Sequence, residues 1–274
     1  MRFRPCIDIH NGKVKQLVGG SLKDEGDVAK ENFVSEKSSS YYANLYKENG
    51  LKGGHIIILN GKDSEYYEDT RNAAIMALST APGLMQIGGG VNEANAMDYI
   101  EKGASHVIVT SYIFENGKLS YDKLKKLVNA VSKDRIVIDL SCRKKNGDYY
   151  VVVDRWQTFT DVKLTEETLI ELSDYCDEFL IHGVDVEGKG SGMEEDLVKL
   201  LAKYVKRIND NVSSDDRDGL SVVTYAGGLG SYENIEKFKE ISEGYLDYTI
   251  GSALDIFGGK LEFEKVIKIQ DNIG

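Results

Sequence analysis

The chain has few cysteines and no long apolar run. Its three cysteines, Cys6, Cys142 and Cys176, are odd in number, lie far apart and lack the spacing of metal ligands, which favours a reducing compartment over a disulfide framework. No segment approaches the roughly 20 apolar residues of a membrane span, and the first ten residues (MRFRPCIDIH) lack the apolar stretch of a signal peptide. We therefore expect a cytoplasmic protein with no membrane partner.

Basic residues and histidines are also scarce. The 34 Lys and Arg residues are outnumbered by 45 Asp and Glu residues, and the net charge of −11 argues against nucleic acid as a partner. A small anionic ligand is not excluded, because a few backbone amides can hold a phosphate inside an acidic protein. His10, His55 and His106 are scattered, so the sequence predicts no metal site.

Eight short apolar segments alternate with helical patterns along the chain. Most are continuous β-branched runs, which are typical of parallel strands buried on both faces. They cover residues 3–9, 54–60, 83–88, 106–111, 135–140, 178–183, 220–226 and 248–252. A helical period is clear at 124–131 and 197–208, where apolar residues recur three and four positions apart. This order in 274 residues predicts an α/β fold, a single (β/α)8 barrel domain over residues 1–274.

Two segments interrupt the alternation. DYYVVVDRW at 148–156 indicates a hairpin inserted after the fifth strand, at about 144–156, and the polar stretch at 209–219 is interpreted as a solvated loop. Asn92 and Ser231 occupy positions expected of helix N-caps, and Gly103 stands where a helix would end. Neither interruption has the composition of a linker between domains.

Several features recur four strands later. The matching pairs are Asp8 with Asp139, Gly89-Gly90 with Gly227-Gly228, and Ser111 with Ser252, at offsets of 131, 138 and 141 residues. Such a repeat predicts a barrel built from two similar half-barrels. The two aspartates would then face each other across one mouth, with a glycine-rich turn beside each.

The glycine-rich turns are candidate phosphate sites. A phosphate approaches a backbone closely where side chains are absent, and the free amides at a helix start point towards it. A tight strand-to-helix turn explains one such motif equally well, but two copies at the mouth of a barrel favour phosphate binding. Four further residues would complete the two sites: Thr110, Ser111, Gly251 and Ser252. The expected partner is a small molecule with a phosphate at each end.

Asp8 and Asp139 are the candidate catalytic residues. A carboxylate at the end of a buried strand costs desolvation energy unless it has a partner or a chemical role. An ion pair would explain either residue alone. As a symmetric pair beneath a bisphosphate they suit proton transfer, with one carboxylate taking a proton from carbon and the other donating to a ring oxygen.

Four other residues are candidate substrate contacts. Trp156, the only tryptophan, is either a core residue or a flap residue that stacks on a planar heterocycle. Arg143 could clamp a phosphate or carboxylate, although a solvated turn explains it nearly as well. His182 ends the sixth strand, and Asp185 follows in a segment with glycines at 188, 190 and 192 that suggests a mobile loop.

Motifs along essentially the whole chain resemble those of the histidine-biosynthesis barrel isomerase family. They are PCIDIHNGKVKQLVGG, QIGGGV, VIVTSYIF, VIDLSCR, EFLIHGVDVEG, VVTYAGGLGS and TIGSALDIFGG, and the similarity is closest to the eukaryotic-type branch. That family converts the formimino-aminoimidazole-carboxamide ribotide (ProFAR) from its aldose to its ketose form, PRFAR, by an Amadori rearrangement. The resemblance implies an enzyme without metal or cofactor, in which Asp8 accepts the proton and Asp139 donates it. We expect it to act as a monomer.

The sequence departs from the bacterial-type pattern, and alternatives remain. Many bacterial-type members carry a threonine at the end of the sixth strand, where this chain has Gly183-Val184, and the second strand ends in LNG without an aspartate. The nearest alternative is the sister barrel, the cyclase subunit of imidazole-glycerol-phosphate synthase. The opening IDIHNGKVKQ and the insertion that carries Trp156 favour the isomerase. A second substrate, phosphoribosyl-anthranilate, and a non-catalytic barrel that binds phosphosugars are further alternatives.

Overall fold

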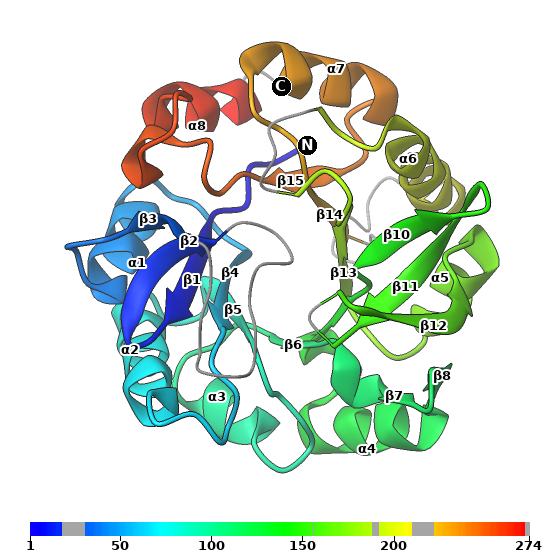
Figure 1. Cartoon of the computed structure of the whole chain (residues 1–274), viewed down its shortest axis with the longest axis horizontal. Helices are drawn as coiled ribbons and strands as arrows, with labels where there is room; N and C mark the ends of the chain where they lie inside the picture. The colour runs from blue at the N-terminus through cyan, green and yellow to red at the C-terminus, as the bar shows by residue number, and fades with distance from the viewer. Residues whose placement is uncertain (18–30, 155, 188–191, 210–221, 272–274) are drawn as a thin grey trace.

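Eight parallel strands form a ring surrounded by helices (Figure 1). The structure is a computed structural model that describes residues 1–17, 31–154, 156–187, 192–209 and 222–271. In chain order the ring strands are β1 (Cys6–His10), β4 (Gly54–Ile58), β5 (Met85–Gly88), β6 (Val107–Val109), β9 (Ile136–Asp139), β13 (Glu178–His182), β14 (Val222–Ala226) and β15 (Asp247–Thr249). Each of the eight predicted apolar segments therefore overlaps one ring strand. The predicted (β/α)8 barrel is confirmed.

The ring closes between the start of the chain and β15. The ten-stranded sheet has the order β15-β14-β13-β9-β6-β5-β4-β1-β2-β3, and the eight ring strands pair in parallel. Phe3 forms a parallel bridge with Tyr248; the Arg4 amide donates to the Tyr248 carbonyl at 2.8 Å, and the Tyr248 amide donates to the Arg2 carbonyl at 3.0 Å. These bonds connect β15 to the residues just before β1 and so close the eight ring strands into a barrel.

One helix follows each ring strand. The helices are α1 (Ser39–Glu48), α2 (Tyr67–Thr80), α3 (Ala96–Glu101), α4 (Tyr121–Val131), α5 (Glu166–Leu172), α6 (Glu195–Asn209), α7 (Tyr232–Ser242) and α8 (Phe263–Asp271). Both segments with a clear helical period, 124–131 and 197–208, lie in helices, α4 and α6, whose apolar stripes pack on the sheet. None of these helices, as far as the structure describes them, has the length and apolar character needed to cross a membrane.

The helix ends match the sequence in two cases out of three. The Ser231 side chain accepts a hydrogen bond from the Asn234 amide at 3.2 Å and caps α7, and Gly103, with φ +104°, follows the end of α3. The expectation for Asn92 is wrong. α3 starts only at Ala96, with Asn95 as its N-cap residue, because Asn92 uses its side chain in the preceding turn to accept from the Ala94 amide.

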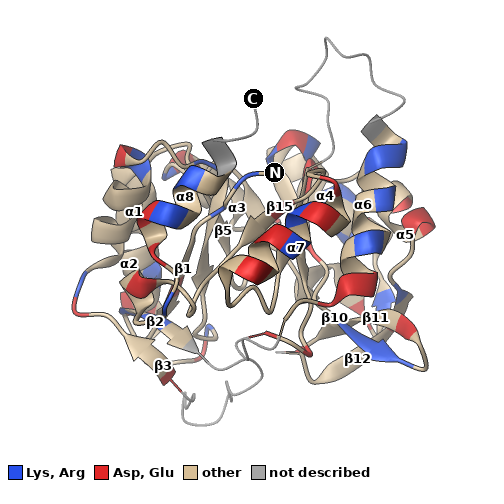
Figure 2. Cartoon of the chain, turned by 90° about the horizontal axis from the view of Figure 1, so that it is seen from above, with Lys and Arg blue, Asp and Glu red and all other residues tan. Residues whose placement is uncertain are grey.

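Two antiparallel extensions rise from one end of the barrel (Figure 2). β2 (Lys13–Leu17) and β3 (Glu31–Val34) extend from β1, and β10 (Cys142–Lys145), β11 (Asp148–Val153) and β12 (Thr158–Lys163) form a separate sheet after β9. A short pair, β7 (Phe114–Glu115) and β8 (Lys118–Leu119), follows β6. The segment in which we expected a hairpin, about 144–156, contributes to β10 and β11. The polar stretch at 209–219 lies outside the described residues, apart from Asn209 itself.

The inside of the barrel is layered because every second residue of a strand points inward. β13 illustrates this: Glu178 meets Arg4 near the amino end, Leu180 belongs to an apolar layer, and His182 reaches the mouth. The apolar layer consists of Ile57, Ile108, Val137 and Leu180. It separates a buried ionic layer at one end from the carboxylates at the other.

Candidate active site

A cavity of about 620 Å³ opens at the carboxyl ends of the ring strands. This is the end of a (β/α)8 barrel at which active sites lie. Its lining includes most of the residues singled out in the sequence: Asp8, Gly89, Gly90, Thr110, Ser111, Asp139, Trp156, His182, Gly227, Gly251 and Ser252. β1 and β9 are four strands apart in the ring, as are β5 and β14, so Asp8 faces Asp139 and the two glycine turns stand on opposite sides.

Arg143, Asp185 and Gly228 are not part of this lining. Arg143 Nε donates to Asp185 Oδ1 at 2.9 Å, and the Lys144 amide donates to Asp185 Oδ2 at 3.1 Å. The two predicted contact residues thus bind each other and join β10 to the segment after β13. At Gly228, a Cβ atom would lie 2.0 Å from the Gly192 carbonyl oxygen, so glycine is required there by the neighbouring chain. The glycines at 188 and 190 lie outside the described residues.

The glycine turns have two different causes. At Gly89 (φ +100°) a Cβ atom would lie 2.1 Å from the Ile58 carbonyl oxygen, and at Gly227 (φ +132°) it would lie 2.9 Å from the Gly183 carbonyl oxygen. These two glycines therefore allow backbone segments to approach each other. Gly90 (φ +71°) has open space instead, and the nearest atom to a Cβ there would be Lys62 Cε, at 3.8 Å. The first turn thus leaves room for a ligand.

Asp8 is a buried carboxyl group with little compensation from its neighbours. Burial raises its pKa to about 7; the charge of Glu187 adds to this rise, and His182 and a hydrogen bond from Gln16 oppose it. Gln16 Nε2 donates to Asp8 Oδ2 at 3.4 Å. A carboxyl group that titrates near neutral pH is suited to general acid–base chemistry.

Asp139 has a different environment. Its Oδ1 atom accepts from Ser141 Oγ at 3.0 Å and lies 3.3 Å from His182 Nδ1. Burial lowers the pKa of His182. The charge of Asp139, the hydrogen bond to Asp139 and the charges of Glu187 and Asp8 act in the opposite direction, and the net result is a pKa raised to about 9. His182 is therefore an imidazolium at neutral pH, paired with Asp139.

Trp156 lies over this ion pair. Its ring centroid is 6.0 Å from that of His182, at an interplanar angle of 42°, and its backbone has φ +69°. A left-handed conformation is uncommon for a residue with a large side chain and is typical of functional segments. The indole lines the cavity, so the core alternative for Trp156 does not describe its position.

Sequence reasoning did not predict several of the lining residues, and four of these bear on the charges and hydrogen bonds of the site: Gln16, His55, Lys62 and Glu187. Burial lowers the pKa of His55 to about 3, so this imidazole is neutral. Burial raises the pKa of the Glu187 carboxyl group, and its Oε2 has no hydrogen-bond partner among the described residues. Glu187 comes two residues after Asp185 in a turn that follows β13, where no strand period indicates which side chain faces the cavity.

Lys62 differs from the other lining residues in its charge. Among the lining residues that the structure describes, it is the one Lys or Arg. It follows β4 and stands beside the Gly90 turn. A cation at this turn would complement a bound phosphate. The sequence signal was LNGK, a lysine just beyond the end of the second ring strand.

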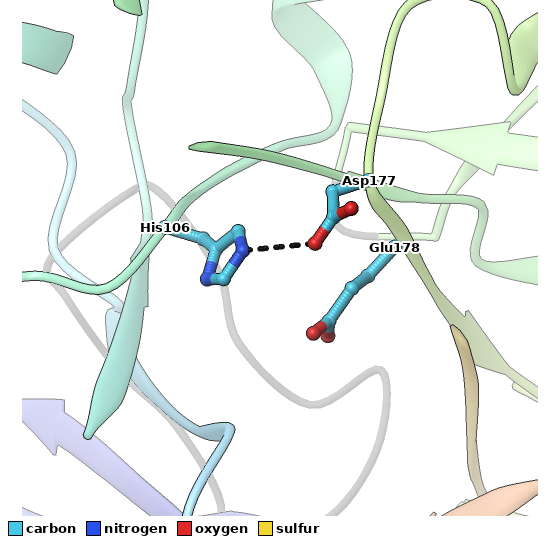
Figure 3. A group of neighbouring side chains, drawn as sticks. All are labelled: His106, Asp177 and Glu178. Atoms are coloured by element: carbon cyan, nitrogen blue, oxygen red, sulfur yellow. Dashed lines mark hydrogen bonds and ion pairs between the residues drawn. The ribbon is translucent and has the colours of Figure 1, made fainter. Parts of the chain in front are cut away.

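A second cluster of titratable groups lies at the opposite end of the barrel, where the ring strands begin (Figure 3). Nitrogen and oxygen atoms of His106, Asp177 and Glu178 lie within 4.8 Å of one another. His106 Nε2 contacts Asp177 Oδ2 at 3.1 Å, while Glu178 accepts from Gln86 at 2.6 Å and pairs with Arg4 at 3.3 Å. These donors are already engaged within the protein, and the arginine beside Glu178 opposes a second cation.

Comparison with known proteins agrees with this architecture. The family model described as histidine biosynthesis protein matches residues 2–262. The chain belongs to this family. Three similar curated proteins carry the name 1-(5-phosphoribosyl)-5-((5-phosphoribosylamino)methylideneamino)imidazole-4-carboxamide isomerase, which is the ProFAR isomerase.

The similarity to these relatives extends over nearly the full chain. The Medicago truncatula protein, named as chloroplastic, is 49% identical over 97% of this chain and 81% of its own length. The Neurospora crassa protein is 44% identical over 94% of each chain. The Saccharomyces cerevisiae protein is 43% identical over 100% of this chain and 99% of its own. The predicted family membership is confirmed, and these three relatives are eukaryotic.

Proposed function

We propose that this protein is an isomerase that converts ProFAR to PRFAR in histidine biosynthesis. The strongest support is the placement of two carboxylates, Asp8 and Asp139, at facing strand ends inside one cavity with glycine turns on opposite sides. Relatives with the isomerase name that match nearly the whole chain support the same reaction. Residues 1–274 would act as a single-domain monomer in the cytoplasm, without a metal or cofactor.

The reaction requires one proton in and one proton out. A donor protonates the ring oxygen of the sugar, the bond from this oxygen to the first sugar carbon breaks, and the nitrogen lone pair forms a C=N bond. An acceptor then removes the proton on the neighbouring carbon, and the electron pair left behind gives an enol that rearranges to the ketone. Asp8 is the acceptor in this proposal, because its pKa of about 7 leaves much of it ionised and still basic at neutral pH.

The donor is Asp139, acting with His182. The His182 imidazolium holds a proton next to Asp139 Oδ1, and this proton can pass through the carboxylate to the sugar oxygen. Glu187 is a second candidate donor, since burial raises the pKa of its carboxyl group and its Oε2 has no described partner. Each such proton transfer is worth about 10²–10⁴-fold in rate.

The two phosphates would lie on opposite rims. One rim combines Gly90, Thr110 and Ser111 with Lys62, and the other combines Gly227, Gly251 and Ser252. Trp156 would stack on the planar imidazole carboxamide between them. Arg143 and Asp185 would act indirectly, by holding the segment that carries His182 and Glu187.

The test is turnover of ProFAR by the purified protein, followed by chromatography of the ketose product. Activity should persist with a chelator present. Ammonia-dependent cleavage of PRFAR would instead indicate the cyclase, and binding without turnover would indicate a non-catalytic barrel. Turnover of phosphoribosyl-anthranilate would add a second substrate.

A further inference from the structure

Gln16 is the one side chain among the described residues that hydrogen-bonds Asp8. It belongs to β2, is only 4% exposed and lines the cavity. Its Nε2 atom donates to Asp8 Oδ2 at 3.4 Å and approaches Cys6 Sγ at 3.8 Å. An amide donor favours the charged form of a carboxyl group, whereas burial favours the neutral form. Gln16 is therefore the protein group whose hydrogen bond counteracts burial at this carboxylate.

The other end of the same amide lies against Gly251. A Cβ atom on Gly251 would be 2.3 Å from Gln16 Oε1 and 3.2 Å from its Cδ. Gly251 does not have the left-handed backbone that favours glycine. Glycine is therefore needed at this position to leave room for Gln16, not to adopt an unusual backbone conformation. Gln16 thus fills a slot between Asp8 and the rim turn at Gly251-Ser252, and this contact fixes where its amide group lies.

We propose that Gln16 is a positioning residue for the proton acceptor: it orients the Asp8 carboxylate and stabilises its ionised form. Because Gly251 has no side chain, it leaves the space that the Gln16 amide occupies. This inference rests on the proposed function for its catalytic consequence. The prediction that the ionisation of Asp8 depends on Gln16 needs only the hydrogen bond between the two side chains, whatever the substrate. The counterpart Asp139 needs no such residue, because Ser141 and His182 bind it directly.

The first test is the titration of Asp8 in the protein without substrate, by carboxyl carbon NMR, in wild type, Gln16→Met and Gln16→Glu. Methionine keeps the length of the side chain and removes the donor. The midpoint should rise by at least half a pH unit in Gln16→Met and further in Gln16→Glu, which adds a second negative charge. Equal midpoints in all three proteins would overturn the proposal. This readout does not depend on which substrate the enzyme uses.

The second test is the pH profile of kcat/KM with ProFAR. The fall of kcat/KM towards low pH, the acidic limb of the profile, reports the ionisation of the acceptor in the free enzyme. In Gln16→Met this limb should move to higher pH, so that kcat/KM falls at least about twofold at pH 7 and recovers at pH 9. A loss that is the same at every pH would mean a structural role only. Absence of ProFAR turnover in wild type would defeat the proposed function and leave the NMR result standing.

A double-variant cycle tests the contact with Gly251. Gly251→Ala introduces a Cβ atom where Gln16 Oε1 lies, and it should reproduce the shift of the acidic limb. In a Gln16→Ala background the space is free, so the same change should move the limb no further. Coupled residues in contact behave in this non-additive way. Independent, additive shifts would contradict the role of Gly251.

Discussion

His182 Nδ1 lies 3.3 Å from Asp139 Oδ1, and this contact makes the two half-barrels unequal. Leu180 pairs with Asp139 in the parallel register of β13 and β9, so His182, two residues further on, reaches the same face at the mouth. Asp139 has a cationic partner and a hydroxyl, while the side chain that hydrogen-bonds Asp8 among the described residues is the Gln16 amide. Two carboxylates at equivalent positions of a repeat thus have different partners, which suits them to different roles in acid–base catalysis.

The stability of the protein should depend on His182 at alkaline pH. Its pKa is raised from 6.5 to about 9 in the folded protein, so its contribution is complete below pH 6.5 and is lost as the pH rises through 9. This shift corresponds to on the order of 3 kcal/mol. Urea unfolding from pH 6 to 10 should therefore show a steeper loss of unfolding free energy in wild type than in His182→Asn.

The matched control for this experiment is His106→Asn, because His106 also pairs with an aspartate but at the other end of the barrel. Its pH dependence above pH 7 should follow that of wild type. Parallel curves for wild type and His182→Asn over this range would mean that the imidazolium does not contribute.

Asp139→Asn should abolish turnover and keep ProFAR affinity within about tenfold, because the phosphate contacts supply most of the binding. Glu187→Gln separates the two donor candidates. If Asp139 donates, Glu187→Gln should keep kcat within about tenfold, whereas a loss of 10²-fold or more would make Glu187 the donor. Asp134→Asn, an exposed aspartate outside the cavity, is the control and should leave kcat unchanged.

The fold was predictable because buried parallel strands are continuous apolar runs, which leave a strong signal such as HIIILN at 55–60. Asp8 and Asp139 could also be predicted, since each is a carboxylate in an apolar run: Asp139 ends β9 and Asp8 lies in the middle of β1. Glu187 and Lys62 were missed because they lie in loops, where sequence period does not show which side chain turns inward. The mutual pairing of Arg143 and Asp185 could not be foreseen, since 42 residues separate them and the contact depends on the path of β10.

The glycines show a second limit of the sequence. Gly89 and Gly227 are needed because backbone segments approach closely, and Gly90 because its backbone is left-handed (φ +71°), yet the sequence shows only glycine at all three positions. Bulk at Gly89 would therefore act on the fold as well as on ligand binding. A valine there would meet the Ile58 carbonyl oxygen and damage the fold. Gly90→Ala meets no neighbouring backbone atom, but the left-handed φ of +71° strains the turn, so its unfolding free energy is measured beside its phosphate binding.

We expect Arg4 to contribute strongly to the stability of the barrel at the end where the ring strands begin. Its Nε atom lies 2.8 Å from Asp247 Oδ2 and its Nη1 atom 3.3 Å from Glu178 Oε2, and all three side chains are less than 10% exposed. Arg4→Leu would remove the buried cation from Glu178 and leave Asp247 with the exposed Arg2, and it should lower the unfolding free energy by about 3–5 kcal/mol. Arg2→Leu, which removes a 65% exposed partner of the same Asp247, should cost less than about 1 kcal/mol. Similar losses for both variants in urea unfolding would contradict this role.

Inorganic phosphate should protect the folded protein, because a ligand that binds the native state stabilises it by mass action. At ten times its dissociation constant the gain is about 1.4 kcal/mol. Thermal unfolding in tens of millimolar phosphate, against chloride at equal ionic strength, measures this. Gly90→Ala should reduce the protection, and an unshifted wild-type transition would count against the rim sites.

Lys62 should strengthen phosphate binding at the Gly90 rim without taking part in the chemistry. Lys62→Met should raise KM about tenfold and leave kcat nearly unchanged, because the same phosphate contact exists in the bound substrate and in the transition state. Lys62→Arg should restore most of the affinity, and Lys52→Met, an exposed lysine outside the cavity, should have no effect. The phosphate protection measured by thermal unfolding should fall in parallel with the affinity. If KM is unchanged in Lys62→Met, the cation beside Gly90 does not meet the substrate, and that rim must hold phosphate through amides and hydroxyls alone.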